Sequence, residues 1–267
     1  MIKPREIQQK ARRIGVRDQQ IEKDYVLSWI LKGISEHDFL SNKLIFKGGT
    51  VLKKIYFEDY RFSEDLDFTI LDHHMTNDQL FQWFTETFDY IREEANIPLE
   101  IIDENEFRTG GINFYISYIG PLGGQGNNKK VKIDVSRNET LVFDPTNKNT
   151  FICYSDLDTY KLQCYSLEEI LIEKMRSVMQ RMQARDFYDI WYLLAIHKMD
   201  AEYLIPEFKT KCAAQELNAT DFHKQMHKRL PQYKARWQGS LKEQIKNIPD
   251  FNQAEREILR SIRQLKF

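Results

Sequence analysis

Two stretches of sequence decide the fold: KGGTVLKK at Lys47–Lys54 and RFSEDLDF at Arg61–Phe68. A short apolar strand is predicted at Leu44–Phe46, and the two glycines of the first stretch interrupt it. The second stretch leads into another strand, predicted at Leu66–Leu71. The pattern therefore predicts a strand, a tight turn, a short helix and a second strand, in that order.

The glycine pair predicts a site for phosphate groups. Gly48 and Gly49 allow a close approach of the backbone, and the N–H groups at the start of the following helix point at a ligand there. We expect Thr50 to cap a helix over Val51–Tyr56 and to offer its hydroxyl as a further donor. Lys53 is expected to reach a β- or γ-phosphate. A tight turn with no ligand is the alternative, because this is not a P-loop sequence.

Side chains of the second stretch alternate between two faces, as they do along any strand. The polar face is expected to carry Arg61, Ser63, Asp65 and Asp67. Two carboxylates at this spacing repel each other unless a cation lies between them. Mg²⁺ prefers oxygen ligands and is usually held by one or two carboxylates plus phosphate oxygens. We therefore expect Asp65 and Asp67 to bind Mg²⁺ or Mn²⁺, the alternative being an ordinary acidic surface.

A third carboxylate stands at the centre of KIDVS (Lys132–Ser136), within a strand predicted at Lys130–Ser136. Asp134 faces away from Ile133 and Val135, which belong to the core. Beside the aspartate pair, Asp134 would complete a two-metal site as a ligand, or would act as base for an acceptor hydroxyl. A solvent-facing aspartate on a half-exposed strand is the alternative.

The character of the chain changes near Tyr165. Strands and helices mix before this point, and helices dominate after it, where Ser166 and Glu169 fit a capping box. We expect a catalytic α/β domain at 1–165 and a helical domain at 166–267. The other predicted elements are helices Asp18–Glu36 and Asn77–Ala95 and strands Leu99–Asp103, Ile112–Ile119 and one within Tyr160–Tyr165.

The helical half carries charges on apolar faces. Lys174 lies on the apolar stripe of its helix, where a lysine is costly unless it is paired or bound to an anion. Asp186 also faces inward, with Asp189 on a neighbouring face. These aspartates can pair with Lys174 or Arg181 in a salt-bridge cluster that joins the two halves. Alternatively, one basic group reaches the phosphates of a nucleotide, and both interpretations can hold together.

Composition limits the class of protein. The 267 residues carry a net charge of −1, so no overall basic field indicates a general nucleic-acid binder. Residues 200–267 nevertheless hold a mild excess of Lys and Arg, which suits an RNA acceptor. The three cysteines are widely spaced, as in a reducing cytosol. Without a signal peptide or a membrane span in the sequence, we expect a cytoplasmic protein.

Five segments occur in an order that resembles the AbiEii/AbiGii toxin family. They are KGGTVLKK, RFSEDLDF, KIDVS, Glu168–Lys174 and RDFYD at Arg185–Asp189. The segment IEKDYVLSWIL (Ile21–Leu31) also resembles the N-terminal helix of that family. The chain is thus similar, from Ile21 to Leu194, to the nucleotidyltransferase-like toxins of type IV toxin–antitoxin and abortive-infection systems.

The resemblance implies an α+β fold: a polymerase-β-like nucleotidyltransferase core with a mixed sheet, followed by a helical C-terminal domain. The residues expected to bind the nucleotide are Gly48, Gly49, Thr50, Lys53, Arg61, Ser63 and Lys174. Those expected to carry the reaction are Asp65, Asp67, Asp134, Lys174 and Asp186, the first three as metal ligands. By the family pattern, Lys174 contacts the phosphates and Asp186 is the acid of a further motif.

These expectations describe a metal-dependent enzyme that moves a nucleoside monophosphate from an NTP to a macromolecular hydroxyl. The favoured acceptor is tRNA, and the favoured role is the toxin of a toxin–antitoxin or phage-defence pair, with a separately encoded antitoxin. Three alternatives stay open: a nucleotidyltransferase for a small molecule such as an aminoglycoside, an inactive fold that binds RNA or a partner, and a kinase-like reaction.

Overall fold

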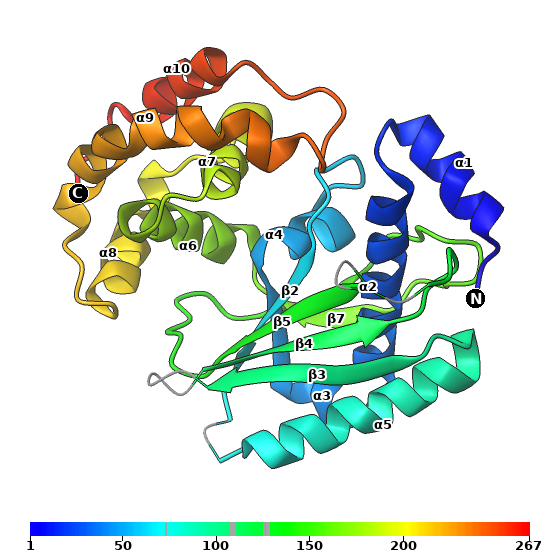
Figure 1. Ribbon diagram of the computed structural model, residues 1–267. Coiled ribbons are helices and arrows are strands. Elements are labelled where there is room, and N and C mark those ends of the chain that lie inside the picture. Colours follow the sequence, from blue (N-terminus) through cyan, green and yellow to red (C-terminus); the bar gives the residue numbers. More distant parts are fainter. Residues whose placement is uncertain (73, 107–110, 125, 127–128) are drawn as a thin grey trace. The chain divides into compact units, whose positions relative to one another are not determined.

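The computed structural model describes residues 1–72, 74–106, 111–124, 126 and 129–267 (Figure 1). The chain divides into two compact units. The first contains Met1–Glu139 and Pro145–Cys164, and the second contains Thr140–Asp144 and Tyr165–Phe267. The short segment Thr140–Asp144 therefore packs with the helical residues, although the expected domain at 1–165 had included it.

In the described residues, the first unit is built on a mixed sheet of seven strands in the order β3-β4-β5-β2-β1-β7-β6. The strands are β1 (Leu44–Lys47), β2 (Asp65–Ile70), β3 (Leu99–Glu106), β4 (Ile112–Tyr118), β5 (Lys130–Ser136), β6 (Thr146–Asn149) and β7 (Lys161–Cys164). β2 is parallel to β5 and β1 is parallel to β7, while the other neighbouring strands are antiparallel. The strands that carry the sequence motifs, β1, β2 and β5, are therefore neighbours.

The first unit also contains five helices within its described residues, of which α5 packs on the apolar face of the sheet. They are α1 (Pro4–Ile14), α2 (Asp18–Glu36), α3 (Leu40–Lys43), α4 (Gly48–Val51), which continues as a π-helical turn at Leu52–Tyr56, and α5 (Asn77–Ala95). α5 lies along the sheet (Figure 1), and its Phe84 ring meets Phe114 of β4 with 5.1 Å between centroids. α2 packs closely on α5 at Gly33, where a Cβ atom would lie 2.6 Å from Thr87.

Strand alternation gives the sheet one apolar and one polar face at its centre. Phe46 of β1, Phe68 of β2 and Ile133 of β5 are fully buried on the apolar face. The residues between them point the other way and include charged side chains, because successive strand residues alternate. The candidate site therefore lies on the polar face.

The second unit is helical, as predicted. Its elements are α6 (Leu167–Gln180), α7 (Ala184–Trp191) with a π-helical turn at Tyr192–Ile196, a 3-10 turn at Glu202–Leu204, α8 (Ile205–Ala213), a 3-10 turn at Ala219–Asp221, α9 (Phe222–Leu241) and α10 (Phe251–Ile262). Aromatic rings form its core: Phe187 of α7 stacks on Tyr233 of α9 and on Phe251 of α10, with centroids 5.0 and 5.6 Å apart. The Tyr233 hydroxyl donates to the carbonyl oxygen of Val178, 3.1 Å away.

The structure confirms the α+β class, and α2 and α5 have the bounds that were predicted. Among the described elements, α1, α3 (Leu40–Lys43) and β6 were not predicted. α1 is mostly polar and buries only Ile7 and Ala11, and β6 is the polar sequence TNKN at an edge of the sheet. The residues Ile7, Ala11 and Ile14 of α1 do recur at helical spacing, a short pattern that the sequence analysis passed over, whereas β6 has no apolar residue from which a strand could be predicted.

Candidate active site

The three acidic residues that the sequence singled out lie together on the polar face of the sheet. Asp67 of β2 is the register partner of Asp134 of β5. Asp65 lies two residues before Asp67 and therefore on the same face. The pairing of two parallel strands brings into one group carboxylates that are far apart in the sequence.

The glycine turn lies directly against this group. Gly48 has a φ of 80°, in the left-handed region, and a Cβ atom there would lie 2.2 Å from Oδ2 of Asp67. A Cβ atom on Gly49 would lie 2.6 Å from Nη2 of Arg61. Glycine is the residue that accepts both the left-handed conformation and the close approach. The turn, Asp67 and the buried Arg61 guanidinium therefore belong to one site.

The role predicted for Thr50 as a helix cap is wrong. The helix begins at Gly48, with Lys47 at the N-cap position and no side-chain cap. The buried Thr50 hydroxyl instead donates to the carbonyl oxygen of Asp65 at 2.6 Å. It ties the first residue of β2 to the helix that follows the glycine turn, which positions Asp65. A contact between Thr50 and a nucleotide stays a prediction.

Three other predicted residues lie outside β2. The strand begins at Asp65, so Arg61 and Ser63 lie in the buried segment that leads into it, rather than on a regular strand face. Lys53 donates to the carbonyl oxygen of Glu58, and its ammonium lies 4.8 Å from the centroid of the Phe62 ring. Burial lowers the pKa of Lys53, and the charge of Asp24 opposes this shift. Phosphate contacts of Lys53 stay a prediction.

Two lysines that sequence reasoning passed over share the polar face. Lys132 is the register partner of Asp65, and its ammonium donates to both carboxylate oxygens of Asp134, at 2.9 and 2.7 Å. Lys47 is the register partner of Asp67 and donates to Ser136 Oγ at 3.1 Å. Alternation along β5 could have revealed Lys132, which lies two residues before Asp134. Lys47 becomes apparent only from the pairing of β1 with β2.

Charge determines the protonation state of Lys132. Burial lowers its pKa, but the hydrogen bond to Asp134 and the charges of Asp134 and Asp65 outweigh this effect and raise the pKa above its usual value. Lys132 is therefore a permanent cation at neutral pH, located among the acidic residues.

The donor set on this face fits Mg²⁺ or Mn²⁺. The Asp65 and Asp67 carboxylates are hard oxygen donors on one strand face, beside the glycine turn. Within the described part of the chain, no three His, Cys, Asp or Glu side chains gather to hold a metal ion on their own. Mg²⁺ commonly takes one or two carboxylates and completes its ligands with water and substrate phosphates, so Asp65 and Asp67 suffice for that mode.

In the second unit, Lys174 is at the centre of a buried ion-pair cluster. Its ammonium lies 2.7 Å from Asp186 and 3.0 Å from Asp189. Arg181 reaches both oxygens of Asp186, at 2.7 and 3.1 Å. Burial would raise the pKa of Asp186, but the charges of Lys174 and Arg181 hold it well below its usual value. The pairing proposed from the sequence is confirmed within this unit, while a contact with phosphates stays a prediction.

The capping box predicted at the start of α6 forms only in part. Ser166 Oγ accepts a hydrogen bond from the N–H of Glu169 at 3.1 Å. The Glu169 carboxylate accepts instead from the N–H groups of Val142 and Phe143, at 3.0 and 2.9 Å, and from the Lys211 ammonium at 2.7 Å. These contacts hold the segment Thr140–Asp144 on the helical unit.

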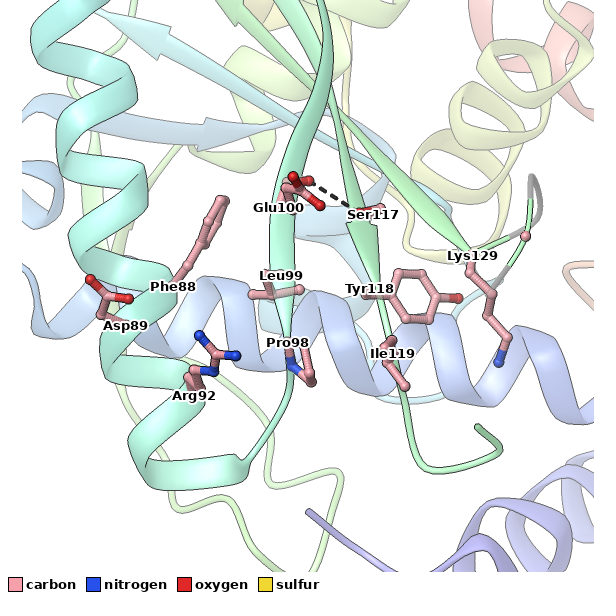
Figure 2. A pocket seen from close by; sticks show the side chains of 11 residues that line it. Phe88, Asp89, Arg92, Pro98, Leu99, Glu100, Ser117, Tyr118, Ile119 and Lys129 are labelled. Atoms are coloured by element: carbon pink, nitrogen blue, oxygen red, sulfur yellow. Dashed lines mark hydrogen bonds between the residues drawn. The ribbon is translucent and has the colours of Figure 1, made fainter. Parts of the chain in front are cut away.

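A cavity of about 430 Å³ lies elsewhere in the first unit (Figure 2). Arg92 of α5, Glu100 of β3 and Tyr118 of β4 are among the residues that line it, and none of the sequence-predicted site residues does. On β4 its lining includes Ser117 and Tyr118, whereas Asn113 is the residue that pairs with Asp134. The cavity is therefore separate from the carboxylate group.

No helix in the described ranges is both long and apolar enough to cross a bilayer.

Comparison with solved structures supports the fold. The chain is similar to JHP933 from Helicobacter pylori, with a TM-score of 0.58 and 17% identity over 91% of this chain and 90% of that one. It is also similar to MenT4, a nucleotidyltransferase toxin from Mycobacterium tuberculosis, with a TM-score of 0.62 and 15% identity over 100% of this chain and 91% of that one. No curated protein matches the chain.

The match to a family covers both units. The model of the nucleotidyl transferase AbiEii toxin of type IV toxin–antitoxin systems matches residues 29–261. This range includes the glycine turn, the carboxylate group and the Lys174 cluster. The chain therefore belongs to the AbiEii family of nucleotidyltransferase toxins.

Proposed function

We propose that this nucleotidyltransferase moves a nucleoside monophosphate from an NTP to a hydroxyl group of tRNA, with the help of a divalent cation. The observation that carries the proposal is the register of β2 with β5, which groups Asp65, Asp67 and Asp134 beside the Gly48 turn. Membership of a type IV toxin family implies an NTP as substrate and an antitoxin as partner. The proposed place of action is the cytoplasm, where NTPs and tRNA occur together.

In this proposal the residues of the first unit have two separate roles, binding the phosphates and binding the divalent cation. The N–H groups of Gly48 and Gly49, with the Arg61 guanidinium, bind phosphate oxygens. Asp65 and Asp67 hold the divalent cation. A bound cation would neutralise charge on the triphosphate and polarise the α-phosphorus. In the second unit, Lys174 remains a predicted phosphate contact, with Asp186 as the residue that positions it.

Asp134 handles the acceptor in the proposed reaction. Its carboxylate orients the acceptor hydroxyl and takes its proton as the oxygen attacks the α-phosphorus in line. The bond from the α-phosphorus to its bridging oxygen breaks, and pyrophosphate leaves. Asp134 is 28% exposed, which is compatible with contact to a substrate.

The choice of an RNA acceptor is supported by helix α9. Its residues Phe222–Leu241 include five Lys or Arg and no Asp or Glu. Phe222, Tyr233 and Trp237 of α9 are buried, while its basic side chains Lys224, Lys228, Lys234 and Arg236 are exposed. A helix with a basic outer face is the electrostatic pattern expected for contact with a phosphate backbone.

The test is a transfer assay. Purified protein and Mg²⁺ are mixed with total tRNA and each NTP, labelled at the α-phosphorus in one series and at the γ-phosphorus in another. We expect α-label on tRNA with the wild type and none with Asp65→Ala/Asp67→Ala or in the presence of a chelator. Equal labelling by wild type and variant would contradict the assignment of Asp65 and Asp67 as ligands of the divalent cation.

Other outcomes identify the alternatives. Transfer of the γ-label would indicate phosphoryl transfer by a kinase-like reaction. Absence of label on tRNA, with NTP-dependent labelling of an aminoglycoside, would replace the acceptor by a small molecule. RNA binding without transfer of any label, unchanged in the double variant, would favour an inactive binding protein.

A further inference from the structure

The feature from which we argue is the contact between Lys132 and Asp134 on β5. The Lys132 ammonium donates to both oxygens of the Asp134 carboxylate, at 2.9 and 2.7 Å. The two side chains are 29% and 28% exposed, so this pair lies at the surface of the site rather than in the core. Its position follows from strand alternation, which puts residues two apart on one face.

Lys132 also stands next to the aspartate pair of β2. It is the register partner of Asp65, just as Asp134 is the register partner of Asp67. The four residues therefore form a square of neighbours on two parallel strands, with one lysine and three aspartates.

This arrangement affects how many metal ions the site can hold. In a two-metal site, a third carboxylate such as Asp134 would hold a cation of its own or share one with the aspartate pair. Mg²⁺ requires its oxygen ligands at about 2.0–2.1 Å. The ammonium that already binds both oxygens of Asp134 would repel a cation at that distance, since the two charges have the same sign.

We propose that Lys132 takes the place of a second metal ion, so that the site binds one divalent cation through Asp65 and Asp67. Lys132 supplies the other positive charge and keeps Asp134 as its own partner instead of a metal ligand. This inference rests on the proposed function, because it presupposes a cation at the aspartate pair. It replaces the sequence-based expectation of a two-metal site with a site of one metal ion and one lysine.

Lys132 is thus a positioning residue that acts through Asp134. Held at both oxygens, the Asp134 carboxylate keeps one orientation toward the acceptor hydroxyl. Because the ammonium is attached to the chain, its charge is present whatever the concentration of free metal.

The experiment counts bound Mn²⁺. The full chain is titrated with Mn²⁺ in the presence of each α,β-methylene NTP in turn, and free Mn²⁺ is measured by electron paramagnetic resonance. The variants are Lys132→Met, which removes the charge, Lys132→Arg, which keeps it, and Lys132→Met/Asp134→Asn, which also removes the carboxylate. Lys130→Met is the matched control, since Lys130 lies two residues earlier on β5, over the Tyr115 ring.

We expect one bound ion in the wild type, in Lys132→Arg and in Lys130→Met. Lys132→Met is expected to bind two, and the double variant one, because the second ion needs Asp134. Two ions in the wild type would overturn the inference and leave the proposed function intact. A single ion in a folded Lys132→Met protein would also overturn it. Absence of bound Mn²⁺ from the wild type would instead remove the divalent cation from the proposed function itself.

The wild-type count decides the question even if Lys132→Met does not fold, which circular dichroism and thermal melting would reveal. In that case the Lys132→Gln variant replaces it in the same titration, with the same expected second ion.

Discussion

Gly48 is the residue at which backbone conformation and site chemistry meet. Its φ of 80° belongs to a region that other residues enter at a cost of about 1–2 kcal/mol. A side chain at this position would also collide with Oδ2 of Asp67, at 2.2 Å from its Cβ atom. Glycine is therefore required here both by the backbone conformation of the turn and by the position of the Asp67 carboxylate.

We predict that Gly48→Ala lowers both stability and activity. The methyl group displaces Asp67, and a displacement of about 1 Å at a reacting group can cost on the order of 100-fold in rate. Thermal melting and the tRNA transfer assay measure the two effects. Gly239→Ala is the control, because a Cβ atom there meets nothing within 4 Å; in helix α9 it should stabilise by about 0.5–1 kcal/mol. Full transfer activity in Gly48→Ala would contradict the assignment of the turn to the site.

At the scale of elements, α6 and α7 are held together by charge as well as by apolar contact. Lys174 of α6 and the two aspartates of α7 are almost completely buried. Removal of one partner from a buried ion pair typically costs about 3–5 kcal/mol, because the other charge is left in a poor environment. The stability of this helix pair therefore depends on the ionisation of Asp186.

We predict that the helical unit loses stability in acid through Asp186. Its carboxyl has a pKa of about 3.9 when the chain is unfolded, and a lower pKa when folded, because Lys174 and Arg181 outweigh the effect of burial. The stabilisation is therefore fully present above about pH 4 and is lost as the pH falls through the folded pKa. Hydrogen exchange of α6 and α7 between pH 7 and pH 3 measures it.

Asp186→Asn provides the control for this pH dependence. The variant should exchange faster than the wild type at pH 7, and the difference should shrink as the pH falls below 4. If the difference stays constant across this range, ionisation of Asp186 does not stabilise the helix pair.

A further prediction concerns the contact of helix α9 with the RNA acceptor. The charge reversal Lys224→Glu/Lys228→Glu should weaken tRNA binding and reduce the slope of log affinity against log salt by about 1–2, since each phosphate contact contributes about one unit. Fluorescence anisotropy with labelled tRNA at several salt concentrations measures this slope. Lys3→Glu/Lys161→Glu makes the same change in net charge at two other exposed lysines and should leave the slope unchanged. Equal slopes in both double variants would exclude α9 as the RNA contact.

At the scale of the whole molecule, the family match includes both units. The acidic group and the glycine turn belong to the first unit, and the Lys174 cluster belongs to the second. A toxin of this family acts through catalysis, so loss of the carboxylates should remove its effect on cells.

We predict that induced expression of the wild type arrests bacterial growth and that Asp65→Ala/Asp67→Ala does not. Growth curves after induction, with immunoblots to match protein levels, are the measurement. Lys130→Met, on the neighbouring strand, should arrest growth like the wild type. Undiminished arrest by the aspartate variant would support the alternative of an inactive fold that binds RNA or a partner.

The sequence by itself determined the features that depend on neighbouring residues. α2 and α5 have the bounds that the sequence predicts, and the pairing of Lys174 with Asp186 follows from their places on helix faces. The shared face of Asp65 and Asp67 follows from strand alternation. Each of these patterns repeats within a few residues, so it can be read without knowledge of the fold.

Only the tertiary structure decided the contacts between distant segments. Examples are the register of Asp67 with Asp134, the Thr50 hydroxyl on the Asp65 carbonyl oxygen, and the Glu169 carboxylate on the segment Thr140–Asp144. The periodicity of one strand does not specify its partner or their register, because those depend on how all the strands pack against one another. For this reason the candidate residues were visible in the sequence, while the place of Lys132 among the aspartates became apparent only in the folded sheet.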